Sequence, residues 1–151
     1  MVNRHSDADE SGGEDESEFL HAATTHVIIG ASYALHNELG FGFLEAVYSN
    51  GLAVLLRDAG HRVDREVKFK IEFHGKIIGR YRADLIVDDK VIVEVKCARA
   101  LDPTHSAQLL NYLRASGLEV GLVLNFGHSA EIKRVVSTRR GPGSVKASRI
   151  V

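Results

Sequence analysis

Three charged residues lie inside the most apolar part of the chain. The stretch from Tyr81 to Ala98 contains two runs rich in valine and isoleucine, yet Asp84 stands in the first run and Glu94 and Lys96 stand in the second. Burying a charge costs free energy unless the charge is paired, hydrogen-bonded or bound to a metal. Two carboxylates and an amine in a predicted strand pair therefore indicate either a salt-bridge cluster or a cation site.

The register of the two predicted strands decides whether these charges meet. A three-residue loop, 88–90, collects the apolar partners on one face and the charges on the other, whereas a two-residue loop would mix them. Opposed Cβ atoms lie roughly 4.5–5.5 Å apart, where two like charges repel by a few kcal/mol at an effective dielectric constant of ~20. A proton, a cationic side chain or a metal must then compensate. The predicted opposed pairs are Val87 with Val91, Leu85 with Val93, Asp84 with Glu94, Ala83 with Val95 and Arg82 with Lys96.

Two interpretations fit this arrangement. In the first, Lys96 and Arg82 neutralise Asp84 and Glu94 in a salt-bridge cluster. In the second, the carboxylates bind a hard divalent cation such as Mg²⁺, which takes one or two carboxylates together with water and substrate phosphate. A lysine beside such a cation can orient a water molecule and offset charge on a phosphoryl transition state. Geometry alone leaves both interpretations open.

The remaining periodicity predicts a single α/β domain with a mixed sheet. Helices are predicted at 19–39, at about 43–59 and from Thr104, its N-cap, to about Ala115. Strands are predicted at 67–73, 76–87, 91–97 and 119–126. Residues 131–137 fit either a last strand or a short helix. The order is helix-helix-β-β-β-α-β.

Composition and charge fit one globular domain with charged ends. The chain has 151 residues, of which 44% are hydrophobic and 26% charged, which is ordinary for a soluble domain. We expect an acidic disordered tail at 1–18, the folded domain at 19–138 and a basic flexible tail at 139–151. The basic tail either contacts nucleic-acid phosphates or aids solubility.

The cysteine count and the hydropathy indicate a cytoplasmic protein. Cys97 is the single cysteine, so no intramolecular disulfide can form, and we interpret it as a small core residue. No apolar run reaches the ~20 residues that a membrane-spanning helix needs, and the acidic N-terminus lacks an apolar signal core. The eight histidines lack zinc-binding spacing, so no zinc is expected.

Three motifs resemble those of a known group of enzymes. Asp84, followed one strand later by Glu94-Val95-Lys96, resembles the signature of the PD-(D/E)xK nuclease superfamily, with Ala83 where the superfamily name has Pro. Gln108 and Tyr112 resemble the Q-x-x-x-Y element of its exonuclease-type branch. Residues 42–48 match the G-x-x-E-x-x-Y motif that names the GxxExxY family, a mostly uncharacterised bacterial group in that superfamily. The resemblance covers about 20–137, and a lone D…ExK pattern would be weak without the other two motifs.

The resemblance implies a fold, a cofactor and a role for each residue. The fold is a restriction endonuclease-like αβββαβ core, whose mixed four- to five-stranded sheet is flanked by helices. The cofactor is Mg²⁺ or Mn²⁺. Superfamily members are often dimers, so a homodimer stands beside a monomer as an open alternative. The implied roles are Asp84, Glu94 and Glu45 as metal ligands, the Val95 carbonyl as a further ligand, Lys96 as the catalytic lysine, and Gln108 and Tyr112 as residues that support the site or contact DNA.

Plainer interpretations stand beside these roles. Tyr48 and Tyr112 equally fit core aromatics whose hydroxyls find buried partners, and Gln108 fits a helix-surface amide. His105 is expected to be an exposed helix residue. At the level of the whole chain, we expect a metal-dependent nuclease acting on DNA, with RNA as the alternative substrate. The alternatives are a non-catalytic or partner-dependent nucleic-acid-binding module with the same fold, and a structural subunit with a salt-bridge network.

Overall fold

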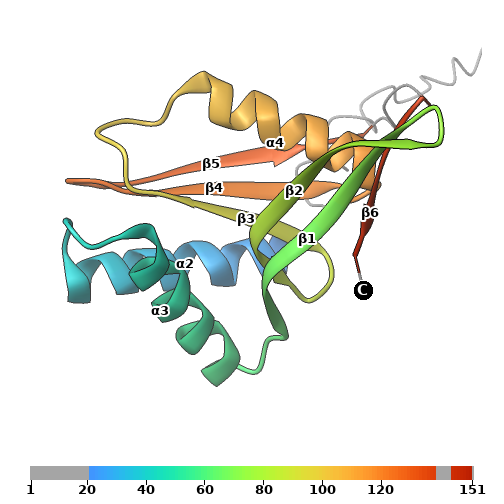
Figure 1. Cartoon of the computed structure of the whole chain (residues 1–151). Helices are drawn as coiled ribbons and strands as arrows, with labels where there is room; N and C mark the ends of the chain where they lie inside the picture. Colours follow the sequence, from blue (N-terminus) through green and yellow to red (C-terminus); the bar gives the residue numbers. More distant parts are fainter. Residues whose placement is uncertain (1–20, 139–143, 151) are drawn as a thin grey trace, which may run out of the picture.

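The computed structural model describes residues 21–138 and 144–150, and within them a six-stranded sheet lies between two layers of helices (Figure 1). The strand order is β5-β4-β3-β2-β1-β6. The predicted tail 1–18 and the segment 139–143 lie outside the described residues. The elements are α2 (Ala22–Leu39), α3 (Glu45–Asp58), β1 (Val63–Phe73), β2 (Lys76–Val87), β3 (Val91–Lys96), α4 (Pro103–Ser116), β4 (Val120–Phe126), β5 (Ala130–Val136) and β6 (Val145–Arg149).

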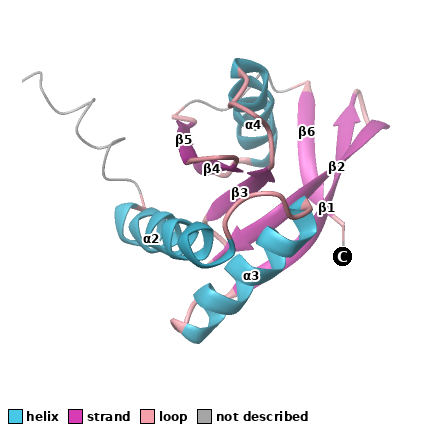
Figure 2. Ribbon diagram, turned by 90° about the vertical axis from the view of Figure 1, so that its left-hand side faces the viewer, coloured by secondary structure: helices cyan, strands magenta, loops and turns pink. Residues whose placement is uncertain are grey.

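The sheet has an apolar core on each face. Helices α2 and α3 cover one face, where Leu52 and Leu56 pack with Val93 and Val95 of β3. Helix α4 covers the other face (Figures 1 and 2) and packs on Ile92 of the same strand. The alternation of β3 between these two cores places Glu94 and Lys96 on the α4 side. The predicted α/β architecture with a mixed sheet flanked by helices is confirmed.

The register of the central strands follows the prediction. The β2–β3 pairs are Val87 with Val91, Ile86 with Ile92 and Leu85 with Val93, as the three-residue loop requires. Strands β3 and β4 are parallel, because α4 returns the chain across the sheet between them, and the other neighbours are antiparallel. The segment left open between helix and strand is a strand, β5.

Two predictions are wrong, one about the start of helix α4 and one about the C-terminal tail. The N-cap of α4 is Asp102 rather than Thr104, since the Asp102 side chain accepts a hydrogen bond from the Thr104 N–H at 2.9 Å. Part of the predicted flexible tail is strand β6, which pairs with β1, so the sheet has six strands rather than four or five. Only Val145 and Ala147 are apolar in β6, and its stability comes from backbone pairing with an otherwise open edge.

A bend in the β1–β2 hairpin fixes the position of Asp84. The ladder pairs Arg65 with Leu85 and Val67 with Ala83 but skips Glu66 and Asp84, and Glu66 has a φ of 51°, unusual for a residue other than glycine. At this point the buried side chains of both strands change from the α2–α3 face of the sheet to the α4 face. Ala83 therefore packs in the α4 core and not, as predicted, on the face of Leu85 and Val87. Figure 2 shows the hairpin and β6 turned strongly relative to β3 and β4.

No helix among the described residues is long and apolar enough to cross a membrane.

Candidate active site

Asp84 and Glu94 lie side by side where β2 separates from β3. The β2–β3 ladder ends at Leu85, and beyond it the Asp84 Oδ2 accepts a hydrogen bond from the Val95 N–H at 2.8 Å. The Glu94 Oε1 accepts a hydrogen bond from the Tyr81 hydroxyl. One oxygen of each carboxylate is thus held by the protein, and this fixes the orientation of both groups.

The two carboxylates repel each other in a partly buried place. Burial raises the pKa of Glu94 to about 8, and the charge of Asp84 and a hydrogen bond with it act in the same direction. The hydrogen bond from Tyr81 and the charge of Lys96 lower the pKa of Glu94 but only partly offset this. The pair therefore cannot carry two negative charges without cost, and near neutral pH it holds a proton in place of one of them.

The salt-bridge interpretation does not fit this geometry. Within the described residues, neither Asp84 nor Glu94 takes part in an ion pair of 4.0 Å or less. Arg82, predicted to oppose Lys96, instead makes an exposed ion pair with Glu66 at 3.7 Å. The bend at Glu66 explains the difference, because it turns Arg82 away from β3. Lys96 ends β3 and pairs in the parallel ladder with Asn125 of β4.

Val95 and Glu45 approach the pair from different directions. The Val95 side chain is buried against α2 and α3, while its N–H contacts Asp84. Glu45 is the exposed first residue of α3, where a carboxylate is favoured by the helix dipole. Asp84 and Glu45 line one cavity of about 400 Å³, together with Arg65 and Arg82.

The cysteine is not the core residue that its position suggested. Strand β3 ends at Lys96, so Cys97 follows it and is exposed. Partial burial and the charge of Glu45 raise the pKa of the Cys97 thiol. A protonated thiol is a poor nucleophile, and the prediction that Cys97 is a core residue is wrong because the side chain is exposed. Because the charge of Glu45 acts on the Cys97 thiol, the Glu45 carboxylate lies near the end of β3.

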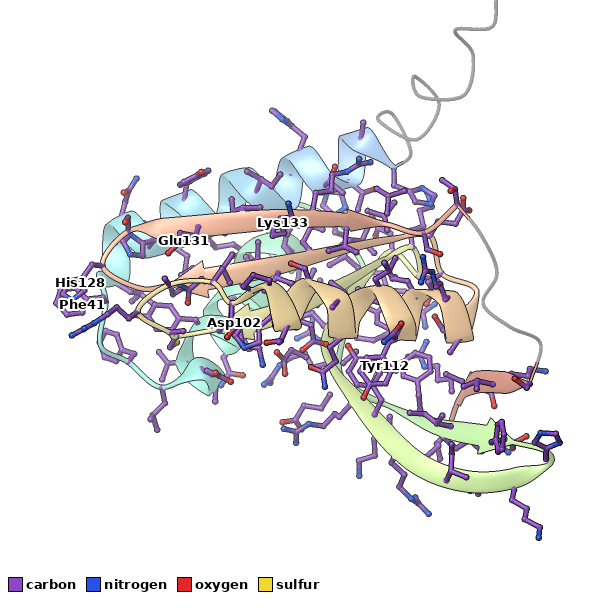
Figure 3. All side chains as sticks on the ribbon, turned by 90° about the horizontal axis from the view of Figure 1, so that it is seen from above. Phe41, Asp102, Tyr112, His128, Glu131 and Lys133 are labelled. Atoms are coloured by element: carbon purple, nitrogen blue, oxygen red, sulfur yellow. The ribbon has the colours of Figure 1, made fainter. Side chains whose placement is uncertain are left out.

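Tyr112 reaches the carboxylates through Tyr81. The two tyrosine rings stack with centroids 3.6 Å apart at an interplanar angle of 7°, and Figure 3 shows Tyr112 on the side of α4 that faces the β1–β2 hairpin. Gln108 is exposed and lines another cavity of about 560 Å³ with Tyr112. His105 is half-buried rather than exposed, and its Nδ1 is buried without a hydrogen-bond partner among the described residues.

Two positioning residues were missed from the sequence. Tyr81 bonds to Glu94, and burial together with the Glu94 charge raises its pKa well above the ordinary value for tyrosine. Asn125 is buried in β4, accepts a hydrogen bond from the Ala98 N–H at 2.8 Å and donates one to the Ala98 carbonyl at 3.0 Å. It thereby fastens the loop that follows Lys96. The one sign of this role in the sequence was that Asn125 is the single polar side chain in an otherwise apolar strand.

Tyr48 is a core aromatic whose hydroxyl is satisfied. Its ring is fully buried and stacks on Phe126 with centroids 4.5 Å apart. Its hydroxyl donates to the Gly40 carbonyl at 2.6 Å and accepts from the Phe43 N–H at 3.4 Å. Tyr48 is thus the core aromatic of the plainer interpretation, and its two hydrogen bonds hold the loop that leads into Glu45.

The arrangement suits a divalent cation with few protein ligands. In the described part of the chain, no three His, Cys, Asp or Glu side chains form a metal-binding cluster. Mg²⁺ needs only one or two carboxylates when water and substrate phosphate complete its shell. The adjacent and uncompensated Asp84 and Glu94 carboxylates meet that requirement, and a cation would neutralise the charge that raises the pKa of Glu94.

A model of the PD-(D/E)XK nuclease superfamily matches residues 22–135. The chain belongs to this superfamily. The match spans every element from α2 to β5, and the order of these elements agrees with a restriction endonuclease-like fold. A search of curated proteins gave no match.

One solved structure shares the fold of this chain. The crystal structure of SSO0001 resembles this chain with a TM-score of 0.50 and 21% sequence identity, over 81% of this chain and 62% of that one. The chain thus spans less than two thirds of that protein, and a similarity at this identity shows the fold alone.

Proposed function

We propose that this chain is a Mg²⁺- or Mn²⁺-dependent nuclease that hydrolyses phosphodiester bonds in DNA or RNA. The observation that carries the proposal is the Asp84–Glu94 pair, which lies together on one part of the sheet without a compensating ion pair among the described residues. A site that costs stability in this way is typical of function rather than of packing.

The residues of the chain have distinct roles in this proposal. Asp84 and Glu94 hold the cation, with Glu45 and the Val95 carbonyl as further ligands. A bound divalent cation supplies a Lewis acid that activates water and stabilises charge on the phosphoryl group. Lys96 places its ammonium beside the pair and offsets the charge that develops on the phosphate oxygens.

The supporting residues act on orientation. Tyr81 holds the Glu94 carboxylate, and Tyr112 holds Tyr81 by stacking. Gln108 lies one helical turn before Tyr112, where it can contact the nucleic acid. The spacing of Gly42, Glu45 and Tyr48 supports placement in the GxxExxY family. The Tyr48 hydroxyl holds the loop that precedes Glu45 by its hydrogen bond to the Gly40 carbonyl. A cytoplasmic location and a homodimer remain predictions.

The direct test is cleavage of end-labelled DNA and RNA with Mg²⁺, with Mn²⁺ or with EDTA. We expect cleavage with a divalent cation and none with EDTA. Asp84→Asn keeps an acceptor for the Val95 N–H but loses the charge, so it should fold normally and lose cleavage. Lys96→Ala should lower the rate by about 10²–10³-fold. Cleavage by Asp84→Asn, or cleavage by Lys96→Ala at the wild-type rate, would show that the mechanism is wrong.

A second candidate is a nucleic-acid-binding module that does not cleave by itself. It is favoured by the absence, in the described residues, of a metal-binding cluster of three side chains. Isothermal titration with Mn²⁺ separates the two candidates. No cation binding, combined with salt-dependent binding of DNA, would favour the module.

A further inference from the structure

The β1–β2 hairpin continues beyond the bend as an arm with two different faces. The arm consists of residues 67–83 with β6 paired along its edge (Figure 1). One face buries Val67, Phe69, Ala83 and Ala147 against α4. The side chains in between point the opposite way, and five of them are basic. These five residues, the basic face, are Lys68, Lys70, Arg80, Arg82 and Lys146.

The register sets like charges directly opposite one another on this face. Lys68 pairs with Arg82, and Lys70 pairs with Arg80. Opposed side chains of an antiparallel pair lie roughly 4.5–5.5 Å apart, and like charges at that distance destabilise the sheet. Two consecutive cation pairs on one face of a hairpin therefore reduce its stability, which indicates a partner that neutralises them.

The protein itself provides little of that neutralisation. Lys70 pairs with Glu72 at 3.1 Å. Arg82 pairs with Glu66 at 3.7 Å, but both side chains are about 60% exposed (58% and 61%), so this pair contributes little. Lys68, Arg80 and Lys146 make no ion pair with any residue that the structure describes. The basic face thus carries five positive charges against two negative ones.

The basic face is continuous with the candidate active site. Arg82 is the residue of the basic face closest in sequence to Asp84, and both line the cavity that Glu45 also lines. Cations two residues apart on a strand lie about 6.8 Å apart, and neighbouring strands lie about 4.8 Å apart. A polyanion that lies along the arm can therefore contact several cations and still reach Asp84 at this cavity.

We propose that the basic face of the arm binds the phosphate backbone of the nucleic-acid substrate and directs it to Asp84 and Glu94. The inference rests on the proposed function and adds the surface that holds the substrate. A polyanion fits the unbalanced charge, and continuity with a phosphodiesterase site favours nucleic acid over an anionic membrane. The contacts are to phosphates, so the arm contributes affinity without base specificity.

The test uses the double substitution Lys68→Ala and Arg80→Ala in the full chain. It removes one cation from each like-charge pair and leaves Arg82 at the cavity unchanged. The control is Lys133→Ala, an exposed lysine on β5 at the opposite edge of the sheet (Figure 3). Binding to a labelled DNA duplex is measured by fluorescence anisotropy between 0.05 and 0.3 M KCl, in EDTA so that cleavage does not occur.

We expect the double variant to bind at least about tenfold more weakly at 0.1 M KCl. The negative slope of log K against log[salt] should become shallower by about two, because two phosphate contacts are lost. Its Tm should equal or exceed that of the wild type, because like-charge repulsion is relieved. The Lys133→Ala control should bind as the wild type does. Weaker binding with an unchanged or higher Tm excludes a merely structural role for these cations.

The proposal is overturned if the double variant binds with the wild-type affinity and salt slope, or if the control weakens binding equally. It is also overturned if the double variant loses binding to phosphatidylserine vesicles while its binding to DNA is unchanged. Cleavage by the wild type but not by Asp84→Asn would leave the proposed function standing in each of these cases. A wild type that neither cleaves nor binds nucleic acid would overturn both proposals.

Discussion

At the scale of single residues, the candidate site depends on a carboxylate that is costly to keep charged. Glu94 lies beside Asp84 and is partly buried, and these two effects raise its pKa to about 8. Its ordinary pKa is 4.5, so the folded chain binds a proton more tightly than the unfolded chain. In metal-free buffer the stability of the fold should therefore decrease as the pH rises from about 4.5 to about 8.

Glu94→Gln removes this cost. The variant should have a higher Tm than the wild type at pH 8 in EDTA, and the difference should shrink toward pH 4.5, where the wild-type carboxyl is already neutral. Differential scanning calorimetry across this pH range provides the measurement. A variant that is less stable than the wild type at pH 8 would show that Glu94 contributes to the structure rather than to function.

Tyr81 tunes the same carboxylate. Its hydrogen bond lowers the pKa of Glu94, so Tyr81→Phe should raise that pKa and shift the pH–rate profile to higher pH. The phenyl ring keeps the stack on Tyr112, and loss of such a supporting bond typically costs 10–100-fold in metal affinity or activity. Cleavage rates with Mn²⁺ between pH 6 and 9 measure both effects. An unshifted profile would show that Tyr81 does not act on Glu94 in the reaction.

At the scale of elements, the turn between β2 and β3 sets the register that brings the charges together. Asp88 and Asp89 both have positive φ, 53° and 54°, which aspartate tolerates better than most residues. The Asp88 carboxylate accepts hydrogen bonds from the Arg62 N–H at 2.9 Å and from the His61 ring at 2.7 Å. These bonds tie the turn to the start of β1.

The substitution Asp88→Asn tests whether these hydrogen bonds stabilise the fold. The bonds with His61 and Arg62 hold the pKa of Asp88 below its ordinary value of 3.8 despite an opposing effect of burial. The carboxylate therefore stabilises the fold above about pH 3.8, and its contribution disappears as the pH falls through the lowered pKa. We expect the variant to lose about 1 kcal/mol at pH 7. Urea unfolding should show a larger loss at pH 7 than at pH 3, and an equal loss at both would show that the Asp88 carboxylate does not stabilise the turn.

At the scale of the whole molecule, the pattern of the sequence predicted the architecture but not its distortions. The β2–β3 register followed from apolar alternation, because a shift by one residue would have buried Asp84 among valines. The bend at Glu66 could not be predicted in this way, since it depends on one backbone angle and on packing against α4. Strand β6 was missed because its stability comes from an edge of β1 that is distant in sequence.

The candidate site was predictable in part for the same reason. Asp84, Glu94 and Lys96 lie on neighbouring strands, so alternation alone brought them together. Tyr81 and Asn125 act across the fold, and nothing near them in the sequence marks their partners. The basic face was also hidden, because a lysine or arginine in a strand looks like an ordinary solvated residue until the register shows which charges are opposed.

The most direct test of the central claim is Mn²⁺ binding measured by isothermal titration calorimetry on the full chain, with Asp84→Asn as the matched variant. We expect the wild type to bind Mn²⁺ with release of protons at pH 7, because Glu94 must ionise, and Asp84→Asn to lose most of the affinity while keeping the wild-type Tm. Equal binding by both proteins, or none by the wild type, would contradict a metal site at Asp84 and Glu94.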